Sequence, residues 1–113
     1  LSGAVIVTTP QEVALMDVRK GIAMFRKTEV PILGVIENMT GEIFGWGGGK
    51  KAAEQFQVPY LGEIALDQRI REGGDLGKPI AVTQPNTPAA HAFMKAAAVL
   101  TEILNQSAAK VNG

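Results

Sequence analysis

The sequence predicts an α/β fold in which a mostly parallel sheet has helices on both faces. Residues 3–9 and 31–37 are two short apolar runs, rich in β-branched residues and bounded by turn formers, which is typical of strands buried on both faces. Between them, apolar residues recur at steps of three and four, as in an amphipathic helix. This stripe consists of Leu15, Val18, Ile22 and Phe25. A strand, a helix and a strand in this order predict a parallel crossover.

The composition fits one folded domain. The 113 residues are 46% hydrophobic and 19% charged, which is enough apolar material for a core. Eleven basic residues balance eleven acidic ones, so we expect neither nucleic acid nor a membrane surface as partner. No apolar run approaches the ~20 residues of a membrane span. Cysteine is absent, which excludes disulfides and thiolate metal sites and favours a cytoplasmic location.

The middle of the chain predicts one more strand. The first helix is expected over residues 11–27, and a glycine-rich connection, residues 40–49, follows the second strand. We expect a short helix over residues 50–57 and a third strand over residues 58–65. The third strand is the weaker prediction because Gly62 interrupts it.

Short elements are expected after the third strand. Asp67 precedes a helical segment as its N-cap, and the pair Gly73 and Gly74 is expected to end that helix. Residues 80–82 are apolar and predict a short extended piece.

The last predicted element is a long helix. Thr87 and Pro88 combine an N-cap residue with a proline at the first helical position, and the helix is expected to run to about Asn105. Residues 106–113 are small and polar and predict a flexible tail. The folded domain is therefore expected over residues 1–105.

The glycine-rich segment of residues 45–50 invites comparison with a phosphate-binding loop. A Walker A loop needs a glycine, four residues, then Gly-Lys and a serine or threonine. The first glycine is replaced by Phe44, and the hydroxyl residue is replaced by Lys51. The sequence therefore does not encode this phosphate loop, although an anion site at the N-terminus of the following helix stays open.

Asn38, at the carboxyl end of the second predicted strand, has two interpretations. Asparagine after a strand often makes a turn or caps backbone groups. Its carboxamide also carries a donor and an acceptor, and ligands bind at the carboxyl ends of parallel strands, so Asn38 could hold an adenine base. His91 is the only histidine, so no metal site and no catalytic residue are predicted.

Several motifs of this chain resemble one family of P-loop ATPases. They are GAVIVTTPQ at residues 3–11, DVRKG at 17–21, LGVIENM at 33–39, and LGEI, LD and IR within 61–71. In this order they resemble the C-terminal half of the Mrp/ApbC proteins, which are related to MinD and ParA and are implicated in carrying or assembling iron–sulfur clusters. The resemblance covers the chain to about Leu104.

The resemblance implies a fold, a cofactor and site residues. The fold would be a partial P-loop NTPase fold containing the last three strands. The asparagine matching Asn38 contacts adenine in the family, and the segment around Ala65, Leu66 and Asp67 passes near the base and ribose. ATP or ADP is therefore the expected cofactor of the parent protein, and apo iron–sulfur proteins are possible partners.

The chain departs from the family pattern in ways that limit this transfer. The family's Walker A loop and magnesium-site aspartates precede the point that matches Leu1, which indicates a segment of a longer protein. The C-x-x-C pair found in many members after the Glu-Asn-Met stretch is replaced by residues 40–44, so a cluster is doubtful. Ala65 stands where a proline is frequent.

The expected function is therefore that of one part of an ATP-binding cluster carrier. This chain would supply the adenine-side wall and part of a dimer surface, and it would have no ATPase activity alone. For this segment alone, the bare edge of the first strand or a helix face predicts self-association. Two alternatives stay open, a MinD/ParA-like partitioning or positioning ATPase and a non-catalytic interaction module.

Overall fold

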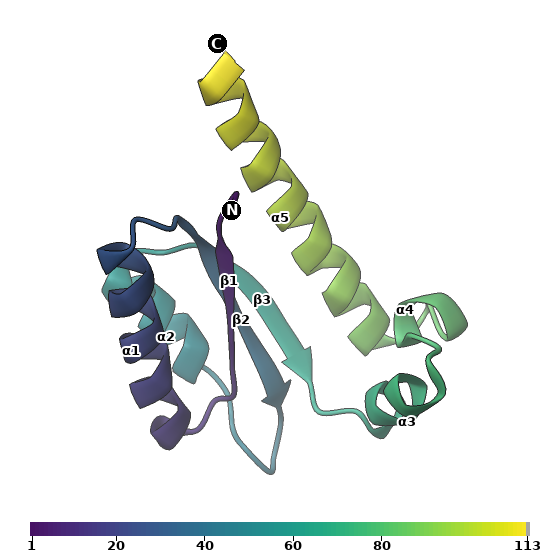
Figure 1. Ribbon diagram of the computed structural model, residues 1–113. Helices are drawn as coiled ribbons and strands as arrows, with labels where there is room; N and C mark the ends of the chain where they lie inside the picture. Colours follow the sequence, from purple (N-terminus) through teal and green to yellow (C-terminus); the bar gives the residue numbers. More distant parts are fainter. Residues whose placement is uncertain (113) are drawn as a thin grey trace.

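The computed structural model describes residues 1–112, and the side chains of residues 1–108. Strands and helices alternate along the first two thirds of the chain, and helices make up the rest (Figure 1). The elements are β1 (Ala4–Thr8), α1 (Glu12–Lys27), β2 (Ile32–Thr40), α2 (Gly48–Phe56), β3 (Tyr60–Ala65), α3 (Gln68–Leu76), α4 (Ile80–Thr83) and α5 (Pro88–Asn112).

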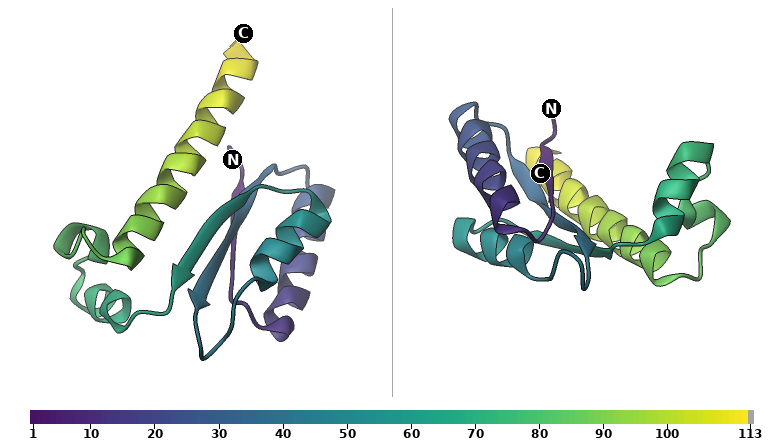
Figure 2. Two further views of the ribbon diagram at one scale, coloured as in Figure 1. Left: turned by 180° about the vertical axis from the view of Figure 1, so that it is seen from behind. Right: turned by 90° about the horizontal axis from the view of Figure 1, so that it is seen from below.

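The three strands form one parallel sheet in the order β1-β2-β3, with β2 in the centre. Helices α1 and α2 lie on one side of the sheet, and α5 crosses the other side (Figures 1 and 2). This arrangement confirms the predicted α/β fold with helices on both faces. It also places the carboxyl ends of all three strands at one edge of the sheet, where the predicted site residues follow.

The core between the sheet and α1 forms from the stripe that the periodicity predicts. Val18 and Ile22 of α1 are buried against Ala52 of α2, with Leu15 and Phe56 packed at the margin. The sheet itself is packed closely. A Cβ atom at Gly34 would lie 2.5 Å from Cγ of Leu61, so the buried leucine side chain of β3 occupies the space that glycine leaves open.

Two expectations about the third quarter of the chain are wrong. Helix α3 continues through Gly73 and Gly74, and Gly77, with a φ of 69°, is its C-cap in the left-handed conformation. Glycine inside a helix costs only about 1 kcal/mol relative to alanine, so two glycines weaken a helix without having to end it. Ile80–Thr83 is a short helix, α4, rather than an extended piece, because Ile80 is buried and packing decides its conformation.

Thr87 caps α5 as expected, since its Oγ1 accepts a hydrogen bond of 3.2 Å from the backbone N–H of Ala90. The helix extends to Asn112, beyond the end expected near Asn105. Flexibility of residues 106–113 stays a prediction. In the part of the chain that the structure describes, no helix combines the length and apolarity needed to cross a membrane.

Both outer edges of the sheet lack a strand partner among residues 1–112. Each of β1 and β3 pairs with β2 only. Val7 of β1 is 59% exposed, so one free edge carries an apolar side chain in solvent. Such an edge can pair with another strand.

Candidate functional site

A cavity of about 170 Å³ opens at the carboxyl ends of β2 and β3. It is lined by Asn38, Met39, Ala65, Leu66, Asp67, Ile70 and Arg71. All four residues predicted to bind the cofactor are among them. The structure thus brings together the polar end of β2 and the segment that leads from β3 into α3.

A backbone irregularity shapes this end of the sheet. Met39 has a φ of 60°, a left-handed conformation that costs a residue with a side chain about 1–2 kcal/mol. The β2–β3 register shifts at this point, between Asn38 and Thr40. The carbonyl of Thr40 then accepts a hydrogen bond of 2.9 Å from the N–H of Leu66. This bond ties the chain after β3 to the end of β2.

Asn38 lies inside β2 rather than after its end, because the strand continues to Thr40. Its side chain is half-buried, and its Oδ1 accepts a hydrogen bond of 3.0 Å from the N–H of Met39. The structure describes no acceptor for its Nδ2 within residues 1–112. A carboxamide oxygen has two lone pairs, so Asn38 still offers one donor group and one acceptor site.

Asp67 begins α3, as the sequence predicts. Its Oδ1 accepts a hydrogen bond of 2.9 Å from the N–H of Arg69, and its Oδ2 forms an ion pair of 2.7 Å with the Arg69 guanidinium. The hydrogen bonds from Arg69 hold the pKa of Asp67 below its ordinary value. Arg69 also donates to Gln84 at 3.2 Å, so this arginine is fixed in place beside the cavity.

Glu37 has a structural role that the sequence analysis missed. It is fully buried in β2. Its Oε2 accepts a hydrogen bond of 2.8 Å from the N–H of Gly47, and its Oε1 accepts one from the N–H of Gly49. These donors lie at the N-terminus of α2, where the helix dipole favours a negative charge. The carboxylate of the chain itself therefore fills the anion site that the sequence left open at this helix.

Two glycines of this loop have separate structural reasons. Gly47, the N-cap of α2, has a φ of 90°, which favours glycine. A Cβ atom at Gly49 would lie 3.1 Å from Cβ of Glu37. One sequence signal could have revealed the contact, since an acidic residue in an apolar strand needs a partner when it is buried.

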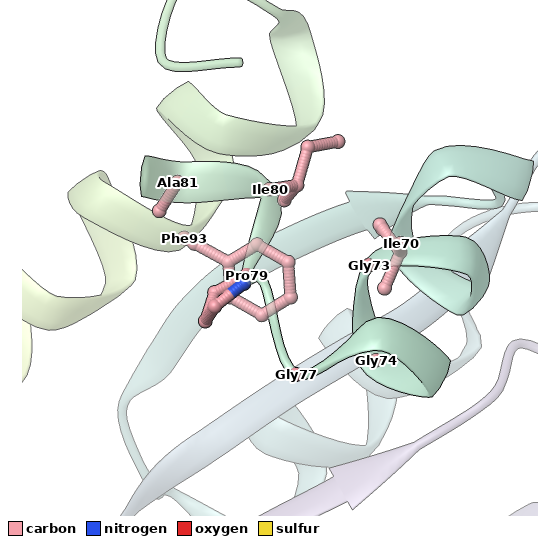
Figure 3. A pocket seen from close by; sticks show the side chains of 8 residues that line it. All are labelled: Ile70, Gly73, Gly74, Gly77, Pro79, Ile80, Ala81 and Phe93. Atoms are coloured by element: carbon pink, nitrogen blue, oxygen red, sulfur yellow. The ribbon is translucent and has the colours of Figure 1, made fainter. Parts of the chain in front are cut away.

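A larger cavity of about 420 Å³ lies between α3, α4 and α5 (Figure 3). Its lining consists of Ile70, Gly73, Gly74, Gly77, Pro79, Ile80, Ala81 and Phe93. None of these side chains carries a hydrogen-bonding group. Because orientation and specificity need a few polar groups, the cavity lined by Asn38 and Asp67 is a better candidate site than this apolar one.

The chain matches a family model described as "ParA: NUBPL iron-transfer P-loop NTPase" over residues 1–101. It is 47% identical over 107 residues to the iron-sulfur cluster carrier protein of Pseudomonas fragi, covering 86% of this chain and 37% of that protein. It is 49% identical over 100 residues to the iron-sulfur cluster transfer protein NUBPL of Dictyostelium discoideum, covering 80% of this chain and 31% of that protein. The chain thus spans about a third of the length of these relatives.

Solved structures of MinD share the fold. The cell division ATPase MinD of Pyrococcus furiosus superposes with a TM-score of 0.79 at 30% identity, covering 90% of this chain and 43% of that one. The septum site-determining protein MinD of Pyrococcus horikoshii, solved with Mg-ADP, gives a TM-score of 0.75 at 33% identity, covering 85% and 40%. These matches confirm a partial P-loop NTPase fold.

Proposed function

This chain belongs to the NUBPL iron-transfer family of P-loop NTPases, and from this premise we propose that it forms the adenine-binding part of an ATP-dependent iron–sulfur cluster carrier. Its relatives are cluster carrier and cluster transfer proteins. The complete protein would bind and hydrolyse ATP and pass clusters to apo iron–sulfur proteins. The lack of cysteine favours a cytoplasmic location.

One observation supports the proposal most directly, namely the position of Asn38 in the cavity between β2 and α3. The edge of adenine presents an amino donor next to a ring acceptor, which matches the acceptor and donor of one carboxamide. Ala65 and Leu66 supply apolar walls for the ring. Asp67 retains a free lone pair on its carboxylate for a ribose hydroxyl.

The residues described here fit a base but not a triphosphate. The loop that precedes α2 lacks the Walker A pattern, and Glu37 already accepts hydrogen bonds from its N–H groups. ATP would supply the phosphoryl group when it is bound, and this chain's own residues would bind and orient its base. The chain alone is therefore expected to hydrolyse no ATP.

An iron–sulfur cluster would be cargo rather than a resident group of this chain. Cluster iron is held mainly by cysteine thiolates, and the sequence contains none. We therefore place the cluster ligands of the carrier outside these 113 residues. The chain would contribute the nucleotide-binding wall and part of a dimer surface.

Binding of adenosine and ADP to the 113-residue chain tests the proposal. We expect both to shift amide NMR signals around Asn38, and Asn38→Ala to remove the binding, whereas Asn86→Ala, in an exposed loop, leaves it unchanged. Asn38→Asp replaces the donor by a second acceptor, and preference should move from adenosine to guanosine, whose edge presents two donors.

Two results would overturn the proposal. If neither adenosine nor ADP binds, the chain is an interaction module without a nucleotide site. If both bind and Asn38→Ala binds them equally well, the base lies elsewhere. A separate assay measures ATP turnover, and a rate above the buffer blank that Asn38→Ala abolishes would contradict the expected inactivity of the chain alone.

A further inference from the structure

Arg71 of α3 lines the same cavity as Asn38, and the sequence analysis gives it no role. Its nearest charged partner among the described side chains is Asp75, at 3.6 Å between Nη1 and Oδ2. The two side chains are 66% and 71% exposed. An ion pair this long and this exposed holds an arginine only weakly, so the Arg71 guanidinium is free to settle over a ligand in the cavity.

The neighbouring arginine is different. Arg69 donates to both carboxylate oxygens of Asp67 and to Oε1 of Gln84. Moving it onto a ligand would break these three hydrogen bonds and leave the Asp67 carboxylate without its partner. Arg71 is therefore the cation at this site that can change partner at little cost.

The cavity is open to solvent on one side, where a planar side chain could cover a bound ring. Leu66 and Met39, two of its apolar walls, are 44% and 39% exposed. Its volume of about 170 Å³ is below the roughly 300–1,000 Å³ of pockets that enclose a whole drug-sized ligand. A single ring system thus fits, with one face left towards solvent.

We propose that Arg71 is a specificity-determining residue that stacks its guanidinium on the exposed face of the purine held by Asn38. A guanidinium is planar, weakly hydrated and stacks well on aromatic faces. A purine offers a larger face than a pyrimidine, so stacking favours purines independently of the hydrogen bonds to Asn38. The inference rests on the proposed function, because it needs a base in this cavity.

Arg71 could instead contact a phosphate of the ligand. Ligands with different numbers of phosphates distinguish this role from stacking on the base. Stacking acts on the base, so Arg71→Ala should weaken adenosine, AMP and ADP by the same factor. A contact to phosphate would leave adenosine unaffected and would weaken ADP most. The affinity that such a contact contributes would also fall steeply with added salt.

The experiment titrates the 113-residue chain with adenosine, AMP, ADP and cytidine and follows amide NMR shifts. For Arg71→Ala we expect a loss of roughly two- to thirtyfold in affinity for the three adenine ligands, the range of cation–π contacts, and a reduced preference for adenosine over cytidine. Arg71→Lys keeps the charge without the plane and should recover only part of this loss. Arg19→Ala, an exposed arginine of α1, is the matched control and should bind as the unmodified chain does.

Other outcomes overturn the inference. If Arg71→Ala binds adenosine as tightly as the unmodified chain, Arg71 does not stack on the base. A loss confined to AMP and ADP would assign it to phosphate. If the unmodified chain binds none of the ligands, the proposed function itself fails, and this result is distinct from binding that is indifferent to Arg71.

Discussion

The carboxylate of Glu37 accepts a hydrogen bond of 2.8 Å from the backbone N–H of Gly47, ten positions later in the chain. This contact joins the centre of the sheet to the N-terminus of α2. A Cβ atom at the adjacent Gly48 would lie 2.5 Å from the carbonyl oxygen of Pro10. The loop is thus packed between the ends of β1 and β2, and Glu37 fixes it beside the strand that carries Asn38.

Replacing Glu37 by glutamine should destabilise the fold. The amide has the same shape, but its NH₂ group meets a backbone N–H, so one buried donor loses its acceptor. We expect a loss of about 2 kcal/mol in the free energy of unfolding, as for hydrogen bonds to charged groups, measured by urea denaturation. Glu63→Gln, on the exposed side of β3, is the control. Equal midpoints for both variants would contradict the role of Glu37.

The single tyrosine, Tyr60 at the start of β3, reports on its burial and on the charges of Glu37 and Glu63. Burial, and then the charges of Glu37 and Glu63, raise the pKa of Tyr60 to about 12. Because this pKa lies above the ordinary value of 10.0, stability should be lost as the pH rises from 10.0 to about 12.

Ultraviolet absorbance of the phenolate measures this titration directly. We expect an apparent midpoint near 12 in the folded chain, near 10.0 in urea, and a lower value in Glu37→Gln. A folded-state midpoint at the ordinary value, with the chain still folded by circular dichroism, would refute the environment described for Tyr60.

Asp67 should make the stability of α3 depend on acid. Its pKa lies below the ordinary 3.8 because Arg69 donates to it, so its contribution is fully present above 3.8 and is lost as the pH falls through the folded value. Asp67→Ala should cost about 1 kcal/mol near neutral pH through loss of the N-cap. Asp67→Asn keeps a cap and should instead flatten the pH dependence below 4, measured by urea denaturation. An unchanged acid profile in Asp67→Asn would show that other carboxylates dominate.

Two adjacent glycines of α3 should respond oppositely to alanine. At Gly74 a Cβ atom would meet nothing within 4 Å, whereas at Gly73 it would lie 2.5 Å from the carbonyl oxygen of Lys78. Gly74→Ala should therefore raise the free energy of unfolding by roughly 0.5–1 kcal/mol. Gly73→Ala should lower it, because the backbone after α3 must move. Thermal unfolding of both variants measures these effects, and equal shifts in their Tm would contradict the packing described for Gly73.

The free edge of β1 should support self-association. Size-exclusion chromatography with light scattering should show dimers or larger species at concentrations on the order of tens of micromolar. Val7→Lys places a charge on the edge and should favour the monomer. Val82→Lys, on α4 and 76% exposed, should not. A monomer in the unmodified chain would rule out this edge as an association surface.

Local sequence patterns predict most of the helices and strands of this molecule well. The stripe of Leu15, Val18 and Ile22 gives α1 and its buried face, and Thr87 gives the start of α5, because periodicity and capping act over one or two helical turns. The same local reasoning predicted that α3 ends at Gly73 and that Ile80 lies in an extended segment. The first failed because a glycine weakens a helix by only about 1 kcal/mol, and the second because Ile80 is buried against other segments.

The sequence by itself determined the strand–helix–strand order, the absence of thiolate ligands and the placement of Asn38 near the carboxyl end of a buried strand. Only the tertiary structure decided that Glu37 accepts the N–H groups before α2, that Arg69 is fixed while Arg71 is loosely paired, and that Asn38 shares a cavity with Leu66. The reason is physical. Propensity, periodicity and caps are set by near neighbours along the chain, whereas burial and hydrogen-bond partners are set by residues that the fold brings together from distant positions.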